Sequence, residues 1–369
     1  MSNEKINLLS ASYPHYKWFI NLVGRWSFIV IYVIAELWSG VVINLMFWQF
    51  INHIIKQDQA SRIYPIMVMI GNTALVVVGG LVINFTTQCV NAIYSIQFIS
   101  NIIFASGIFS CVLFLYVYSL IHVEDEVKEH SNLVGTMKTS LSLKESIKMV
   151  SQSRYVLCIA MIVICYGLTI NILEGPWKAK VVKIYSSTNE YIKFMGYFNL
   201  WVGIASVIFT IIGGNAIRIL GWTTAAYITP LMIIISGSIF FSFIIFDSVF
   251  SSFIDPIFCA VIIGSVQNVL SKSAKYSIFD ATKEMAYIPL NKELRTKGKA
   301  AVEVMGTKFG KSMGALLQFL LFTLIPNVSF DDISYILIIV FIIIGIVWIN
   351  SLYKLSKEYN QKIKDEKII

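Results

Sequence analysis

The residues of this chain that could do chemistry are charged side chains inside apolar stretches. Between residues 272 and 317 a charge-rich run passes without a break into an apolar one, and Glu303, Lys308 and Lys311 lie among Ala, Val, Met and Gly. An ionised side chain at bilayer depth costs about 2.5–3.5 kcal/mol on insertion scales, so such residues usually face a wet cavity or one another. Buried lysines of this kind are suited to binding an anion.

Two sets of residues recur every four positions in this stretch. The glycine set is Gly306, Gly310 and Gly314, and the polar set is Glu303, Thr307 and Lys311. On a helix the glycines form one smooth face for close packing, and the polar residues form a neighbouring face.

The string GTKFGKS in the same stretch invites comparison with a phosphate-binding P-loop. That motif needs four residues between its glycines and a preceding strand, and this chain has three residues and an apolar helical context. We therefore interpret Lys311 as an intramembrane anion ligand rather than as part of a P-loop. The residues that we place beside it as candidate ligands are Gly306, Lys308, Gly310 and Ser312.

Two carboxylates also lie in apolar runs. Glu36, in AELWSG, is about ten residues into the first run, which places it about 15 Å deep at 1.5 Å per residue. Glu174, in ILEGPWKAK, precedes Gly175 and Pro176, which we expect to break or kink the helix. Lys178 and Lys180 follow at once. Either these groups line a cavity, or they form structural pairs and interfacial lysines that extend toward water.

Asp280, Lys283 and Glu284 are spaced three and four residues apart, so they can pair along one helix face. Asp280 is a further candidate site residue because it falls near the inner mouth of an apolar run. The histidines lie at run ends or in loops, and the five cysteines are scattered without metal-ligand spacing. The sequence therefore predicts no catalytic set, no metal and no cofactor.

Composition places the chain in the membrane. Its residues are 57% hydrophobic and 14% charged, whereas soluble domains carry roughly 25% charged residues. The formal charge of +8 falls mostly in the predicted loops, so it does not indicate a nucleic-acid partner. Residues 1–15 lack the apolar core and cleavage site of a signal peptide. We predict an all-α polytopic protein whose surroundings are the lipid bilayer.

A helix needs about 20 mainly apolar residues to cross the hydrocarbon core, and the chain offers about nine such runs. They are Trp26–Ile54, Tyr64–Phe85, Ile96–Ile121, Tyr155–Gly175, Met195–Gly213, Trp222–Ile245, Pro256–Leu270, Ala300–Ile325 and Ser334–Leu352. The seventh is short, and we expect its helix to continue through Lys275 and Phe279. If the first run ends on the cytoplasmic side, Lys and Arg concentrate in the cytoplasmic segments between the runs. The exceptions are four lysines that then lie outside, Lys178, Lys180, Lys183 and Lys193.

The predicted domains are a partial N-terminal half at residues 1–121, a cytoplasmic linker at 122–154 and a six-helix half at 155–369. Two six-helix halves joined by a long loop are the layout of the major facilitator architecture, in which each half holds two three-helix units. On that interpretation the first three-helix unit is missing from this chain. A separately made N-terminal fragment is one possible partner.

Three strings carry a resemblance to a known family: GRWSFIVIYVIAELWSGVVINLMFWQF, ILEGPWKAKV and KYSIFDATKEMAYIPLNKELRTKGKAAVEVMGTKFGKSMGALLQ. They resemble the ADP/ATP translocases of obligate intracellular bacteria and plastids, and the rickettsial type in particular. The resemblance implies a twelve-span, multi-pass protein of the bacterial inner membrane that exchanges external ATP for internal ADP and phosphate. Some relatives carry other nucleotides.

The family's important charges map onto Glu36, Glu174 and Lys311. A further family lysine, in an RDTKD-like motif of the first helix, has no counterpart in this chain. Our hypothesis for the mechanism is that Lys311, with Lys308 and Lys178 or Lys180, holds phosphates while the two carboxylates pair with these lysines in the empty site. Trp38, Trp177 and Tyr276 are candidates for stacking on the base, with packing as the alternative.

Two other functions stay open at this point. One is a proton-coupled facilitator of another organic anion. The other is a non-transporting remnant, because a missing cavity helix would leave the cavity open toward lipid. An enzyme is not predicted.

Overall fold

The computed structural model describes residues 3–38, 47, 51, 57–88, 91–120, 151–291, 294 and 298–368. Its helices are α1 (Asn3–Ser12), α2 (Lys17–Gly24), α3 (Trp26–Leu37), α5 (Gln57–Gln88), α6 (Ala92–Leu120), α9 (Arg154–Ile184), α10 (Thr188–Ile245), α11 (Asp247–Phe250), α12 (Pro256–Ala274), α13 (Asp280–Ala286), α14 (Lys299–Ala301), α15 (Thr307–Leu324) and α16 (Phe330–Ile368). A 3₁₀ turn, η1 (Pro14–Tyr16), and two π-helical segments, η3 (Lys275–Phe279) and η5 (Val302–Gly306), complete the list. The described residues contain no strand, which confirms the predicted all-α class.

Six helices of the described residues are long and apolar enough to cross a membrane, and a pair bent by 64° within residues 14–35 would make a seventh. This agrees with a polytopic protein, although the number is below the nine predicted runs. The predicted first run is described only through residue 38, and α15 is too polar along its length to be among the six. The predicted linker lies outside the described residues from 122 to 150.

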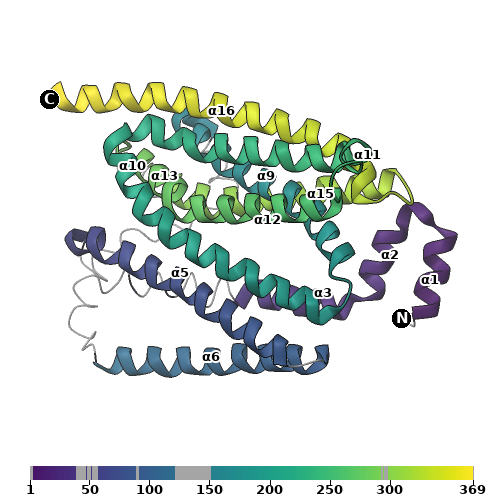
Figure 1. The fold of residues 1–369 in the computed structure, drawn as a ribbon. Coiled ribbons are helices and arrows are strands. Elements are labelled where there is room, and N and C mark those ends of the chain that lie inside the picture. Colours follow the sequence, from purple (N-terminus) through teal and green to yellow (C-terminus); the bar gives the residue numbers. More distant parts are fainter. Residues whose placement is uncertain are drawn as a thin grey trace.

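The helix α10 contains two predicted spans. Its 58 residues would extend about 87 Å if straight, far beyond a hydrocarbon core of about 30 Å. Gly221, with φ 78° and ψ 166°, interrupts the helix between Met195–Gly213 and Trp222–Ile245. A residue with a Cβ rarely adopts this φ. Figure 1 shows α10 folding back on itself, so the fifth and sixth predicted runs are two arms of one hairpin.

The helix α9 forms the centre of the bundle formed by residues 154–368. It packs against α10, α12, α15 and α16, and from Tyr155 to Leu173 its buried residues are distributed around the helix, as expected for a central helix. Capping side chains define the starts of α9 and α12. The Ser153 hydroxyl accepts a hydrogen bond from the Val156 amide at the start of α9. At the start of α12, the Asp255 carboxylate accepts from the Ile257 and Phe258 amides, and Pro256 is the first helical residue.

The helix does not break at Gly175 and Pro176, because α9 runs through both residues to Ile184. A proline removes only one helical hydrogen bond, and neighbouring helices pack tightly around this point. The continuous helix also explains the unexpected outside lysines. Lys178, Lys180 and Lys183 belong to α9 itself rather than to a loop.

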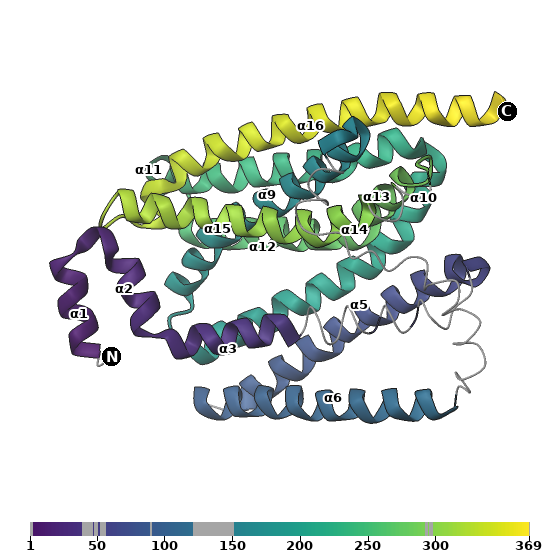
Figure 2. The same cartoon turned by 180° about the vertical axis from the view of Figure 1, so that it is seen from behind.

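The helices α5 and α6 form the periphery, and Figure 2 shows both on the side away from α16. Glycines bring α5 close to the first arm of α10, since a Cβ on Gly203 would lie 2.7 Å from Val76 and one on Gly79 would lie 2.8 Å from the Gly196 oxygen. The apolar surface of α6 is exposed along its length, as expected for a helix in lipid.

Candidate functional site

Charged side chains form two groups along the line where α9, α12–α13 and η5–α15 meet. The central cluster consists of Glu174, Lys178, Lys272 and Lys311, and the end cluster consists of Lys275, Asp280, Lys283 and Glu303. Along α12–α13, Lys272 of the central cluster and Asp280 of the end cluster are eight residues apart. Along η5–α15, Glu303 and Lys311 are also eight residues apart. Eight residues of helix correspond to about 12 Å.

Glu174 is the carboxylate of the central cluster. One of its oxygens, Oε1, lies 3.2 Å from the Lys178 Nζ and 3.5 Å from the Lys272 Nζ. Lys272 also lies over the ring of Phe198, 4.9 Å from its centroid, which provides a cation–π contact. Lys178 and Lys311 are both within electrostatic reach of Lys272. The cluster therefore holds three positive charges and one negative charge.

Two residues of the central cluster lie within candidate membrane spans. Glu174 belongs to the candidate span Arg154–Ile184 and Lys272 to Pro256–Ala286. Lys311 follows the first turn of α15 and is exposed, with no carboxylate of the described residues paired with it. A surplus of positive charge at this depth is costly in lipid, and it favours a water-accessible position.

Small residues bring α15 close to α9. A Cβ on Gly310 would lie 2.6 Å from the Ile164 oxygen, and one on Gly314 would lie 2.8 Å from the Asn171 side chain. One turn further along α15, the side-chain amide of Gln318 donates to the backbone carbonyl oxygen of Asn171 at 3.0 Å and to the side-chain Oδ1 of Asn171 at 2.9 Å. The predicted glycine face is thus confirmed as a packing face.

The other predicted residues near Lys311 divide between packing and exposure. Gly306 and Gly310 are buried at the α9 interface, whereas Lys308 and Ser312 are exposed. Glu36 lies in α3, but its side chain is outside the described residues.

Lys178 and Lys180, predicted as neighbours in one site, take separate positions. Lys178 belongs to the central cluster, while Lys180 is buried, with 4% of its side chain exposed, and pairs with Asp331 of α16 at 3.0 Å. Lys183 pairs with the same carboxylate.

The aromatic candidates for base stacking differ in exposure. Trp177 is completely buried, and its Nε1 donates to the Val261 oxygen at 3.3 Å and to the Ser265 hydroxyl at 3.2 Å. It is therefore a core residue and neither a stacking platform nor an interfacial residue. Tyr276 and Trp38 are exposed.

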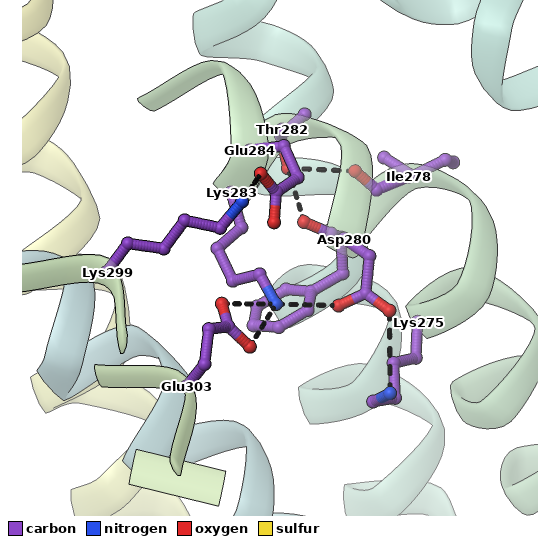
Figure 3. Close-up of polar contacts among 9 residues, drawn as sticks. Lys275, Ile278, Asp280, Thr282, Lys283, Glu284, Lys299 and Glu303 are labelled. Atoms are coloured by element: carbon purple, nitrogen blue, oxygen red, sulfur yellow. Dashed lines mark hydrogen bonds and ion pairs between the residues drawn. The ribbon is translucent and has the colours of Figure 1, made fainter. Parts of the chain in front are cut away.

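Figure 3 shows the end cluster. Lys283 Nζ lies 3.1 Å from Asp280 and 2.9 Å and 3.1 Å from the two oxygens of Glu303. The other Asp280 oxygen lies 3.4 Å from Lys275. The predicted Asp280–Lys283 pair is confirmed. Glu284, which we grouped with that pair, contacts Lys299 instead, at 2.6 Å.

The family follows from the sequence comparisons. A family model described as TLC ATP/ADP transporter matches residues 1–359. The chain belongs to the TLC ATP/ADP transporter family. It is 48% identical to ADP,ATP carrier protein 3 of Rickettsia conorii over 98% of this chain and 76% of that protein, and 47% identical to the protein of the same name from Rickettsia prowazekii over 97% and 75%.

ADP,ATP carrier protein 4 of Rickettsia conorii is 42% identical over 96% of this chain and 73% of its own length. No solved structure matches. Membership of the TLC ATP/ADP transporter family, together with six apolar helices among the described residues, establishes a multi-pass membrane protein.

Sequence reasoning missed Lys272 as a member of this transporter's central cluster. The apolar run ends at Leu270, and although we expect the helix to continue through Phe279, Lys272 is counted among the positive residues of the inside segment. The helix instead continues through η3 and α13, as the expected continuation to Phe279 already indicated. Because α12 runs antiparallel to α9, that continuation places Lys272 at the depth of Glu174.

Proposed function

We propose that this chain exchanges external ATP for internal ADP across the membrane and that the central cluster binds the phosphate groups. The observation that carries the proposal is the sharing of one carboxylate, Glu174, by Lys178 and Lys272, with Lys311 close by. The relatives are named ADP,ATP carrier proteins, and these names supply the substrate class.

Charge matching supports a polyphosphate at this site. ATP and ADP carry about three to four negative charges, and lysine ammonium groups bind phosphate as compact point charges. The cluster has two positive charges in excess of its carboxylate, so binding a nucleotide changes its net charge from +2 to between about −1 and −2.

The shared carboxylate has a role in the empty site. Glu174 holds Lys178 and Lys272 through contacts of 3.2 and 3.5 Å. When a phosphate group binds, these ammonium groups move from carboxylate to phosphate, and Glu174 is released. This exchange of partners keeps the lysines paired with an anion before and after binding.

Obligatory exchange follows from the same excess of charge. Moving an empty, positively charged cluster through a closed, dry state leaves uncompensated charge in a low dielectric. A bound nucleotide pairs the ammonium groups with phosphate oxygens, which lowers that cost, so the carrier changes its exposed side most readily when loaded. Exchange in both directions is the result.

The test is counter-exchange in proteoliposomes that contain the purified chain. Labelled ATP outside should enter vesicles loaded with ADP and should not enter empty vesicles. Lys272→Gln should reduce the initial rate about tenfold or more, because a charged hydrogen bond to phosphate contributes about 1.5–3 kcal/mol. Lys354→Gln, on the exposed surface of α16, is the matched control and should exchange normally.

Three results would contradict the proposal. Equal rates for Lys272→Gln and Lys354→Gln would remove the central cluster from binding. Uptake driven by a pH gradient without internal ADP would indicate the proton-coupled alternative. A complete lack of exchange by correctly folded protein would indicate a non-transporting chain.

A further inference from the structure

A cavity lies at the end of the bundle opposite α13, between α2 and the helices of residues 154–368. Its volume is about 290 Å³, close to the lower limit of about 300 Å³ for small-molecule sites. We call it the boundary pocket, and its charged and aromatic lining residues are Trp18, Lys183, Phe322, Phe330 and Asp331. Figures 1 and 2 both show α2 beside the turn that joins α15 to α16. The pocket is separate from the central and end clusters, because it shares no lining residue with either.

The ends of two candidate spans place this pocket at the edge of the membrane. Lys183 is the last residue but one of the span Arg154–Ile184, and Phe330 and Asp331 begin the span Phe330–Lys364. The first of these spans has 31 residues, so it is about 46 Å long, which is close to the 40–45 Å of a bilayer with its head groups. The lining residues at these span ends therefore lie at the level of the lipid head groups.

Aromatic rings form the apolar wall of the boundary pocket. Between ring centroids, Trp18 lies 5.0 Å from Phe322, and Phe322 lies 4.9 Å from Phe330. Aromatic residues at membrane boundaries commonly face outward as a belt, but Phe322 is only 6% exposed and lines the pocket. Trp18 and Leu22 are four residues apart on α2 and both are exposed, so the apolar wall continues out of the pocket along this helix.

The polar side of the pocket has a surplus of positive charge. Asp331 contacts Lys180 through Oδ1 at 3.0 Å and Lys183 through Oδ2, so these three groups sum to +1. The next carboxylate, Asp332, accepts from the Ser329 amide at 2.7 Å and from its hydroxyl at 2.8 Å, and it does not line the pocket. An ammonium group has three donors. Lys183, which is about half exposed, can therefore donate to a phosphate oxygen while it keeps its contact with Asp331.

We propose that the boundary pocket binds the head group of an anionic phospholipid. The phosphate lies at Lys183, the glycerol fills the pocket, and the acyl chains extend along Trp18 and Leu22. The surplus charge matches a singly charged phosphodiester, and basic pockets between membrane helices bind anionic head groups in other proteins. The ring wall and the position at the membrane edge favour a lipid over free phosphate or a nucleotide, neither of which has a chain to place along α2.

A lipid in this pocket fastens α2 to the bundle. The contacts between this part of the chain and α15 include the Trp18–Phe322 ring pair and the His15 Nδ1, which lies 3.2 Å from the Thr323 oxygen. A head group between α2 and the start of α16 adds contacts on the other side of the same gap. Bound lipid should therefore raise the melting temperature of the chain, whichever nucleotide is transported.

Native mass spectrometry of the purified chain tests the proposal. Protein stripped of lipid in detergent and titrated with phosphatidylglycerol should retain one lipid molecule per chain. Lys183→Gln should weaken this binding about tenfold, because a charged hydrogen bond to phosphate is lost. Lys193→Gln changes a lysine near the start of α10 at the same end of the bundle and outside the pocket, and it should bind as the parent does. Asp331 keeps Lys180 in the first variant, so its melting temperature without lipid should change little.

A second pair of variants tests the apolar wall. Trp18→Ala should also weaken the binding of phosphatidylglycerol, whereas Phe19→Ala, exposed on the same helix and outside the pocket, should not. Phosphatidylglycerol with a photoreactive acyl chain should cross-link to α2 in the parent and less in Lys183→Gln. Equal binding by the parent, Lys183→Gln and Trp18→Ala would overturn the proposal.

Other ligands separate the possible sources of the phosphate group. Diacylglycerol, which has no phosphate, and phosphatidylcholine, which has no net charge, should bind about tenfold more weakly than phosphatidylglycerol. Equal binding of diacylglycerol would show that the lysine has no part in recognition, and displacement of the lipid by millimolar inorganic phosphate or ATP would indicate a site for free anions. Either result would overturn the lipid site. None of these measurements requires nucleotide exchange, so a failure of the proposed function would leave this inference unaffected.

Discussion

At the scale of single residues, the lysines of α9 differ in role although they are close in sequence. Lys178 and Lys180 are two positions apart, which is about 200° around a helix, so they face opposite sides. Lys178 meets Glu174 and Lys272, and Lys180 meets Asp331. A cluster of lysines in the sequence thus becomes one ligand of the candidate site and one structural ion pair.

A pair of substitutions should separate these two roles. Lys178→Ala should lower nucleotide exchange with little loss of stability, because its side chain is about half exposed. Asp331→Asn should lower stability by about 1–3 kcal/mol, because the buried Lys180 loses its carboxylate. Thermal unfolding and exchange rates per folded protein measure both effects. The reverse pattern would assign Lys180 rather than Lys178 to the site.

At the scale of elements, glycine contact between α9 and α15 positions the candidate site. Gly167 lies opposite Gly310, where the backbones approach so closely that neither residue has room for a side chain. This contact holds Lys311 within electrostatic reach of Lys272. The geometry of the central cluster depends on the helix spacing as much as on the charged residues.

Gly310→Ala should therefore destabilise the bundle. Its Cβ would lie 2.6 Å from the Ile164 oxygen, a backbone atom that can move only with its helix, and overpacking of this kind costs about 1–3 kcal/mol. Gly214→Ala on α10 is the matched control, since nothing lies within 4 Å of a Cβ there. Melting temperatures in detergent should fall for the first variant and stay level or rise for the second.

At the scale of the whole molecule, charge is distributed unevenly between the two ends of the bundle. Arg154, Lys299 and Lys357 belong to the end where α9 begins and α16 ends, whereas the turn between α10 and α12 at the opposite end has no lysine or arginine. Positive residues stay on the cytoplasmic side of membrane proteins. The end cluster should thus face the cytoplasm.

Thiol labelling of intact cells tests this orientation. In a cysteine-free background, Ser251→Cys in the exposed turn after α10 should react with an impermeant reagent added outside. Lys357→Cys, exposed on α16, should react only after the cells are permeabilised. Labelling of both positions in intact cells, or the opposite order, would contradict the predicted topology.

Much of this organisation could be predicted from the sequence. The bilayer requires every backbone polar group to be satisfied within the chain, so long apolar runs can only be helices. The same constraint makes buried charges rare, which is why Glu174, Lys311 and Asp280 were identifiable as candidates. The four-residue spacing of Gly306, Gly310 and Gly314 predicted the packing face that the structure contains.

What only the tertiary structure decided was the partner of each charge. Hydropathy ends a span where apolar residues end, so the predicted runs end at Gly175 and Leu270 and leave Lys178 and Lys272 outside them, although α9 and α12 include these residues. The pairing of Lys272 with Glu174, and that of Lys283 with Glu303, depends on the depth at which separate helices lie side by side. That register is set by contacts between residues more than ninety positions apart in one case and twenty in the other, which local sequence patterns do not encode.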